Sequence, residues 1–507
     1  MHKSVAEQAE TTLGEMPAEE FQTAGHAMVD WIARYLRESR RYPVLSRVAP
    51  GEITAQLPGT APEDGASMAE IFADFERVLM PGMTHWNSPG FLAYFCSTGS
   101  GPGILGELLT AALNQQAMLW RTSPAATEVE TLVLEWVRQL LHLPPDFRGV
   151  LTDGGSMSNL LALHAARESA IPEVRTRGLA QRPDGMAARI YCTEYAHSSV
   201  DKAAIVLGVG QESLHRIAVD RGFRMQPAAL REAIRADRRL GMRPMAVVAC
   251  VGTTSTGSID PIAEIAAVCE EERLWLHIDA AHAGSAAMAP QHAWIFDGVG
   301  RADSVTVNPH KWMFTPLDAG LLYCRRLGML KQSLALTPDY LATPEGEANH
   351  LMDTGIQLSR RFRALKLWMV LRYFGASGIR ARIEEHVRLA QQFASWVEDD
   401  ADFELATPPM LSLVCFRAVP AALREDLPKL DALNEELLKR VNASGDVFLS
   451  HARVGGRYTI RLAVGHIQTQ QADLARAWQL LREGLTSLHG CSGCGGSMPG
   501  DAMRRQD

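Results

Sequence analysis

Two charged residues sit where apolar, strand-like runs end, a position at which they can do chemistry. Asp279 ends the run in "LWLHIDAAHAG", and Lys311 follows the run in "SVTVNPHKW". Burying an unpaired carboxylate is expensive, so Asp279 requires a cation, a backbone cap or a cofactor as its partner. A desolvated lysine has a lowered pKa and forms imines with carbonyl compounds. Taken alone, the lysine segment favours a solvent-exposed amine.

A glycine turn and a histidine extend this set. In "GVLTDGGSMSNLLALHAAR" a strand runs into Gly154, Gly155 and Ser156 and then into a helix, whose first N–H groups can hold an anion. A plain helix cap by Ser156 or Ser158 explains that segment equally well. His197 follows another strand in "RIYCTEYAHSSVDKAA", where a capping or packing role is the commoner one for a single histidine.

One ligand accounts for all four features. An anion cradle, a planar residue for stacking, a buried carboxylate and an imine-forming lysine are the groups that pyridoxal 5′-phosphate (PLP) requires. The small residues that follow Asp279 leave room for a bulky group. The residues therefore predict a PLP site.

The elements that must position these residues alternate along the chain. From 88 to 374, short β-branched runs alternate with helical patterns, which predicts a large α/β domain with a mostly parallel sheet and its functional groups at the carboxyl ends of the strands. Residues 1–87 predict a helical arm, with a first helix over 17–36, that packs on a partner subunit. Residues 375–488 predict a small α+β domain, and 489–507 a disordered tail.

Composition narrows the class of protein. The 507 residues are 47% apolar and 21% charged, with a net charge of −8 from interspersed charges, so no nucleic-acid-binding face is expected. Cys491 and Cys494 form a C-x-x-C in a Gly/Ser-rich tail without a second ligand pair, and we expect no metal site. With no signal-like or membrane-length apolar run, we expect a cytoplasmic protein without membrane contact.

The sequence resembles the group II PLP-dependent decarboxylases, most closely the aromatic-L-amino-acid decarboxylase branch. The resemblance runs from about residue 21 to 485 and rests on six blocks in the same order: "PGMTHWNSPGFLAYF", "SPAATEVE", "AHSSVDKA", "WLHIDAAHAG", "NPHKW" and "SRRFRALKLW". It implies the fold-type I (aspartate aminotransferase-like) fold and a homodimer with active sites at the subunit interface.

The resemblance also implies roles for single residues. Lys311 would form the imine with PLP, Asp279 would contact the pyridine nitrogen, and His197 would stack on the ring. The remaining cofactor contacts would be Gly155, Ser156, Thr254, Ala281 and Asn308, with His310 positioning the imine and Trp86, Tyr94 and Ser97 lining the substrate pocket.

Tyr340 matches the loop tyrosine to which the family assigns protonation of the substrate carbon after CO₂ leaves. Relatives with phenylalanine there tend towards aldehyde formation, so Tyr340 favours amine production. Without the resemblance, an ordinary exposed loop tyrosine would be the better interpretation.

Two departures bear on the substrate. His282 stands where many relatives have tyrosine or methionine, and Ser359 where indole-accepting members often have glycine. A smaller pocket with a hydroxyl favours tyrosine or DOPA, with tryptophan, phenylalanine and histidine as other candidates. The alternatives are a decarboxylation-dependent aromatic aldehyde synthase on the same scaffold and a non-catalytic binding relative.

Overall fold

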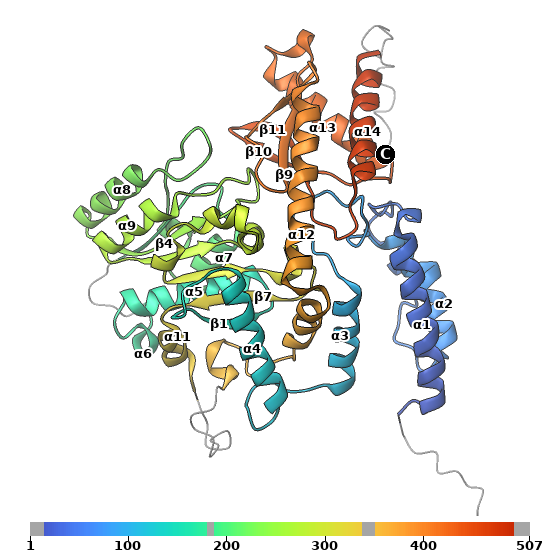
Figure 1. The fold of residues 1–507 in the computed structure, drawn as a ribbon, viewed down its shortest axis with the longest axis horizontal. Coiled ribbons are helices and arrows are strands. Elements are labelled where there is room, and N and C mark those ends of the chain that lie inside the picture. The colour runs from blue at the N-terminus through green and yellow to red at the C-terminus, as the bar shows by residue number, and fades with distance from the viewer. Residues whose placement is uncertain (1–14, 180–186, 337–349, 491–507) are drawn as a thin grey trace, which may run out of the picture.

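The computed structural model describes residues 15–179, 187–336 and 350–490. In these ranges the chain forms a seven-stranded and a four-stranded sheet with helices around both (Figure 1). The strands are β1 (Arg148–Thr152), β2 (Ala188–Cys192), β3 (Leu214–Arg216), β4 (Arg243–Cys250), β5 (Trp275–Asp279), β6 (Ser304–Val307), β7 (Gly320–Cys324), β8 (Phe403–Leu405), β9 (Leu413–Ala418), β10 (Ser450–Val454) and β11 (Arg457–Ala463). The α-helices are α1 (Ala18–Glu38), α2 (Met68–Asp74), α3 (Gly101–Leu113), α4 (Pro124–Leu140), α5 (Gly155–Ala170), α6 (Val174–Arg177), α7 (Ser199–Val206), α8 (Pro227–Arg239), α9 (Ile262–Glu272), α10 (Pro309–Trp312), α11 (Leu327–Leu334), α12 (Ala364–Glu398), α13 (Leu427–Ala443) and α14 (Gln471–Gly490).

The larger sheet has the order β1-β7-β6-β5-β4-β2-β3. Strands β6, β5, β4, β2 and β3 run parallel, whereas β7 lies antiparallel to both of its neighbours. The register aligns Cys250, Asp279 and Thr306 across β4, β5 and β6, so the carboxyl ends of these strands meet at one edge. The predicted α/β class with a mostly parallel sheet is confirmed.

Both faces of this sheet are buried. In β4, Val247 and Ala249 belong to a core cluster shared with α8 and α9, while Ala246 and Val248 belong to a cluster shared with α5 and α7. Because alternate side chains of a strand point to opposite faces, apolar residues are needed at every position. The continuous apolar runs in the sequence have this origin.

The smaller sheet is antiparallel, in the order β10-β11-β9-β8, and has a core of its own with α12, α13 and α14. Helix α12 runs from the larger sheet to the smaller one (Figure 1). Gly375 interrupts it with a φ of 64°, a conformation that glycine adopts more readily than other residues.

Helices α1 and α2 lie together at the edge of the molecule (Figure 1). Trp31 of α1 packs edge-on against Phe72 and Phe75, with ring centroids 6.0 and 5.3 Å away. None of the residues of α1 is buried in the single chain. Helices α1 and α2 therefore pack mainly on each other, through Trp31, Phe72 and Phe75.

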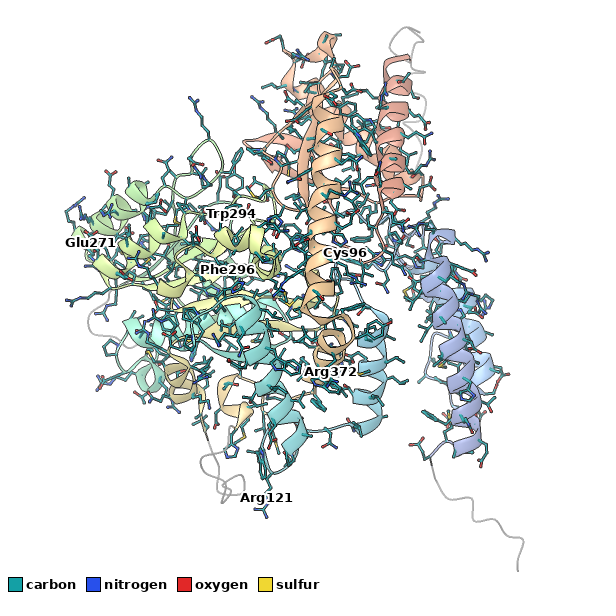
Figure 2. The ribbon with its side chains drawn as sticks, in the orientation of Figure 1. Cys96, Arg121, Glu271, Trp294, Phe296 and Arg372 are labelled. Atoms are coloured by element: carbon teal, nitrogen blue, oxygen red, sulfur yellow. The ribbon has the colours of Figure 1, made fainter. Side chains whose placement is uncertain are left out.

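The described cysteines are free and buried. Cys96 is one of them (Figure 2), and burial raises the pKa of its thiol. No helix in the described part of the chain is long and apolar enough to cross a bilayer. Nor do the described residues contain a group of three or more His, Cys, Asp or Glu side chains arranged to hold a metal ion.

Candidate active site

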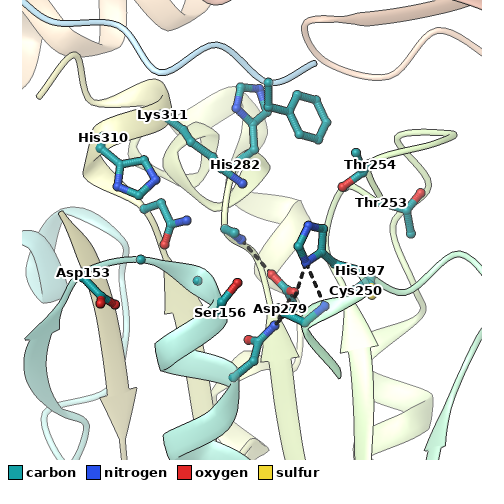
Figure 3. A pocket seen from close by; sticks show the side chains of 18 residues that line it. Asp153, Ser156, His197, Cys250, Thr253, Thr254, Asp279, His282, His310 and Lys311 are labelled. Carbon is teal, nitrogen blue, oxygen red and sulfur yellow. Dashed lines mark hydrogen bonds between the residues drawn. The ribbon is translucent and has the colours of Figure 1, made fainter. Parts of the chain in front are cut away.

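A cavity of about 440 Å³ lies at the carboxyl ends of β4, β5 and β6. This is where a parallel α/β sheet places its functional groups, and the volume suits a small cofactor or ligand. Ten of the predicted site residues line it (Figure 3): Gly155, Ser156, His197, Thr254, Asp279, Ala281, His282, Asn308, His310 and Lys311.

Lys311 lies on the short helix α10, which begins directly after β6. Burial of the amine lowers its pKa below the ordinary 10.5, and Asp279 opposes part of that shift. A lowered pKa leaves more of the amine neutral and nucleophilic at a given pH. The exposed lysine suggested by the segment alone is therefore not what the fold produces.

The Asp279 carboxylate at the end of β5 is held by two donors. The backbone N–H of Ala281 donates to Oδ1 at 3.2 Å, and the amide of Asn159 donates to Oδ2 at 2.9 Å. Hydrogen bonds of this kind fix the orientation of the carboxylate. The Asp279 carboxylate is therefore held in one orientation at the cavity.

His197 lies between β2 and α7, and its ring is exposed to the cavity. Desolvation lowers its pKa, which favours the neutral ring, while Asp279 acts in the opposite direction. Its Nδ1 is hydrogen-bonded to Ser199, with Oγ at 2.8 Å and the backbone N–H at 3.1 Å. The imidazole plane is thereby fixed at the cavity wall.

The glycine turn forms a cradle at the N-terminus of α5. Gly154 has a φ of 155°, and a Cβ on Gly155 would lie 3.1 Å from Asn308 Nδ2 and 3.6 Å from the Ala281 Cβ. The Asn308 Oδ1 is buried without a hydrogen-bond partner among the described residues. The close approach and the free helix N–H groups suit a phosphate.

His310 and Thr254 complete the cavity walls. Burial lowers the pKa of His310 to about 3, and its Nδ1 accepts a hydrogen bond from the backbone N–H of Ala319 at 3.0 Å. Thr254 follows Thr253, whose hydroxyl is bonded to Thr256 and Ser258 at 2.6 and 3.0 Å. His310 is thus held by a backbone donor, and Thr254 lies next to a threonine whose hydroxyl is held in place.

The structure brings one of the predicted substrate residues to the cavity and leaves four others outside its lining. His282 lines the cavity, and its ring lies parallel to Phe95, with centroids 3.9 Å apart. Four others are not among the residues lining the cavity of the single chain: Trp86, Tyr94, Ser97 and Ser359. Trp86 and Tyr94 are 40% and 46% exposed and stack on each other at 5.8 Å. Tyr340 lies outside the described residues.

Among the residues at or beside the cavity that were missed in the sequence, three bear on its chemistry. Phe95 lines the wall next to His282, and Asn159 joins the Asp279 carboxylate to the rest of α5. Arg461 of β11 is 2% exposed, lies 5.5 Å from the Phe95 ring, and has two nitrogens without hydrogen-bond partners in the described structure. An arginine inside the apolar run "YTIRLAVG" is the same kind of signal that identified Asp279.

The donor set fits PLP. One cavity is lined by Asn308, Gly155, Lys311 and Asp279. Asn308 Oδ1 has no hydrogen-bond partner among the described residues, and Gly155 packs closely against Asn308. Lys311 has a lowered pKa, and the Asp279 carboxylate is held in one orientation. Together with the mostly parallel sheet, they define a fold-type I PLP-dependent enzyme.

Comparisons with known proteins narrow that class. The pyridoxal-dependent decarboxylase conserved domain matches residues 50–419. The chain is similar to tyrosine decarboxylase 2 of Narcissus pseudonarcissus (37% identity over 94% of this chain and 96% of that one) and to phenylacetaldehyde synthase of Arabidopsis thaliana (37%, over 92% and 96%). It is also similar to the crystal structure of Oryza sativa TDC with PLP and tryptamine, with a TM-score of 0.90 and 35% identity over 94% of this chain and 100% of that one.

The chain belongs to the pyridoxal-dependent decarboxylase family. It is a carboxy-lyase that uses PLP. The resemblance drawn from the sequence, the cofactor and the enzyme class are confirmed.

Proposed function

We propose that this enzyme removes the carboxylate of an aromatic L-amino acid as CO₂ and releases the amine, with tyrosine or DOPA favoured over tryptophan, phenylalanine and histidine. The observation that carries the proposal is the meeting of Lys311, Asp279 and His197 in one cavity. The relatives support the aromatic class, since they include a tyrosine decarboxylase and a TDC solved with tryptamine.

The cavity residues would share the work of holding the cofactor. Lys311 would hold its aldehyde, Asp279 its ring nitrogen, and His197 one face of its ring. The phosphate would be held at the glycine turn by Gly155 and Ser156, with Asn308, and the ring would also meet Ala281 and Thr254, with His310 beside the lysine.

When bound, PLP accepts the electron pair of the broken Cα–carboxylate bond into its ring. The chain's own residues make that possible. The Asp279 carboxylate would hold the proton of the ring nitrogen, and the lowered pKa of Lys311 would keep its amine available to hold the aldehyde. Tyr340 is the proposed donor of the proton that replaces CO₂ on the substrate carbon.

Arg461 is the proposed partner of the substrate carboxylate. Its guanidinium lies 5.5 Å from the ring of Phe95, a residue that lines the cavity, and Nη1 donates to the Ser450 hydroxyl at 2.8 Å. Nε and Nη2 remain without partners among the described residues, and a buried donor without a partner is costly. A carboxylate would satisfy both nitrogens.

Substrate choice can be tested directly. A panel of aromatic L-amino acids, with amine and CO₂ detection, should give most product from tyrosine or DOPA. Ser359→Gly should shift the preference towards tryptophan, because it removes a hydroxyl and enlarges the pocket. If Ser359→Gly leaves the preference among aromatic rings unchanged, Ser359 does not select the substrate. If no amino acid of the panel gives an amine, the proposed function is wrong.

The second candidate is an aromatic aldehyde synthase, because a phenylacetaldehyde synthase is among the similar proteins. That reaction consumes O₂ and one water and gives aldehyde, CO₂, ammonia and hydrogen peroxide. Tyr340 favours the amine. Peroxide and ammonia in amounts equal to the CO₂ released would establish the synthase instead.

We also propose a homodimer with its sites at the subunit interface, in which residues 1–87 form an arm over the partner beside the large (88–374) and small (375–488) domains. The outer face of α3 supports this, because Leu105, Leu108, Leu109 and Leu113 are 47–54% exposed. Exposure of Ser359 in the single chain is also consistent with a place near the partner's cavity.

The subunit arrangement can be tested by light scattering. Wild type should have twice the 55.5-kDa chain mass. Leu108→Glu combined with Leu109→Glu should give the monomer, whereas Leu240→Glu, at a residue 72% exposed on another helix end, should leave the dimer intact. A dimer that survives the α3 double variant would exclude this face. A cytoplasmic location is also proposed, and cell fractionation would test it.

A further inference from the structure

A chain of hydrogen bonds behind the cavity connects the two residues that would contact the cofactor ring. Asn159 donates from Nδ2 to Ser199 Oγ at 2.8 Å and to Asp279 Oδ2 at 2.9 Å. Ser199 Oγ in turn lies 2.8 Å from His197 Nδ1. His197 and Asp279 face the same cavity (Figure 3), so a single amide on α5 is bonded directly to Asp279 and is linked through Ser199 to His197.

The partners of Asn159 determine which way its amide points. Its Oδ1 lies 2.9 Å from His277 Nε2, and its Nδ2 faces the Asp279 carboxylate. The reverse orientation would bring Oδ1 against a carboxylate oxygen, and two acceptors cannot share a hydrogen bond. Asn159 therefore donates twice from Nδ2 and accepts at Oδ1.

The proton on His277 follows from this orientation. Its Nε2 must carry the proton that Asn159 Oδ1 accepts, and burial lowers the pKa of His277 to about 4, so the ring is neutral. Its Nδ1 then accepts from Ser304 Oγ at 2.8 Å, and that oxygen accepts from Trp275 Nε1 at 2.9 Å. Each polar atom of this buried part of the network has a partner.

The position of the proton on the His197 ring follows from the hydrogen bonds of Ser199. Ser199 Oγ accepts from Asn159, so its own hydrogen is free to go to His197 Nδ1. The Ser199 backbone N–H points at the same nitrogen, 3.1 Å away. An atom that receives two donors carries no proton, so the neutral ring of His197 holds its proton on Nε2.

We propose that Asn159 is a positioning residue that orients the Asp279 carboxylate and, through Ser199, fixes His197 as a hydrogen-bond donor at Nε2. This rests on the cofactor contacts proposed above for Asp279 and His197, not on the identity of the substrate. His197 is then able to donate a hydrogen bond from the ring edge remote from Ser199, and it cannot accept a proton at Nε2. Outer partners of this kind change affinity or activity about 10- to 100-fold when removed from comparable sites.

The test uses the full-length holoenzyme and two readouts besides activity. The first is the rate of PLP release after dilution, and the second is the ¹⁵N solid-state NMR signal of the His197 ring in histidine-labelled protein, assigned with His197→Gln. In wild type, Nε2 should be the protonated nitrogen. Asn159→Leu should release PLP about 10- to 100-fold faster and mix the two forms of the His197 ring.

Two further variants separate positioning from general packing. Ser199→Ala should change the His197 signal in the same direction but less, because the backbone N–H of residue 199 still donates to Nδ1. It should alter PLP release less than Asn159→Leu does, because Asp279 stays bonded to Asn159. It also replaces Asn159→Leu as the test if that variant does not fold. Asn434→Leu removes another fully buried asparagine, which is bonded to the backbone of Ala418, and should lower stability without changing either readout.

The proposal is overturned if wild-type His197 carries its proton on Nδ1. It is also overturned if Asn159→Leu, or Ser199→Ala where the former does not fold, leaves the His197 signal as in wild type. Because PLP release and ring protonation are measured without substrate, these outcomes are separate from those of the amino-acid panel. A panel without amine product would remove the proposed substrate class and leave this inference standing.

Discussion

The His282 imidazole and the Trp312 indole lie parallel, with ring centroids 4.7 Å apart and 6° between their planes. Phe95 covers the other face of His282, so three rings form one wall beside the cavity. Trp312 directly follows Lys311 and donates from Nε1 to His386 Nδ1 at 2.9 Å. The tryptophan of "NPHKW" therefore anchors the helix that carries the reactive amine.

Trp312→Phe should lower the free energy of unfolding by about 1–3 kcal/mol, because it leaves His386 Nδ1 buried without its donor. Chemical denaturation of the holoenzyme measures this. Trp294→Phe is the control, since Trp294 is 48% exposed, and its effect should stay within about 0.5 kcal/mol. Equal stability of the two variants would show that the indole does not anchor α10.

The covalent uptake of PLP should depend on pH through Lys311. Burial lowers the pKa of the amine, so uptake by the full-length apoprotein should remain fast below the pH at which a free lysine becomes protonated, and slow as pH falls through the lowered pKa. Asp279 raises that pKa, so Asp279→Asn should move the midpoint to lower pH. Stopped-flow absorbance measures both; a midpoint at the value of free lysine, or one that rises in the variant, contradicts the assignment.

Arg461→Met should raise KM about 10- to 100-fold, because a hydrogen bond to a charged group contributes about 1.5–3 kcal/mol. Arg461→Lys should recover part of the loss, since it restores the charge without the planar fork. Arg417→Met is the matched control: this arginine is also buried in the small sheet, but it pairs with Asp431 at 3.0 Å. A similar KM change in both variants would mean that Arg461 stabilises the fold and does not bind the substrate carboxylate.

Gly106→Ala should destabilise the protein by about 1–3 kcal/mol, because the added Cβ would lie 2.7 Å from the Lys366 Cα, where α3 crosses α12. Gly101→Ala, at the first residue of α3, meets no atom within 4 Å and should change stability little. Thermal unfolding of the two variants compares them directly. A Gly106→Ala protein as stable as Gly101→Ala would mean that the crossing can widen freely.

Much of the sheet could be predicted because its central strands are short, continuous apolar runs that are buried on both faces. The runs "MAVVACVG", "LWLHIDAA" and "DSVTVN" are β4, β5 and β6, and the residues that follow them meet at one edge because parallel strands end together. The first predicted helix, over 17–36, is α1 at Ala18–Glu38. Local pattern was sufficient for these elements.

The residues that were missed depend on long-range packing. Phe95 lies far from β5 in sequence and reaches the cavity wall only because its segment packs beside His282. Asn159 is a polar position within a helix, and its role is apparent only once Asp279 and Ser199 are placed around it. Trp86, Tyr94, Ser97 and Ser359 line no part of the single-chain cavity, so their predicted roles depend on the proposed dimer.

The attachment of PLP to Lys311 is the central claim, and borohydride reduction of the holoenzyme followed by peptide mass spectrometry tests it most directly. The expected result is one pyridoxyl group per chain, on the peptide that contains Lys311, and none in Lys311→Ala. A pyridoxyl group on another lysine, or a wild-type protein that gains none, would contradict it.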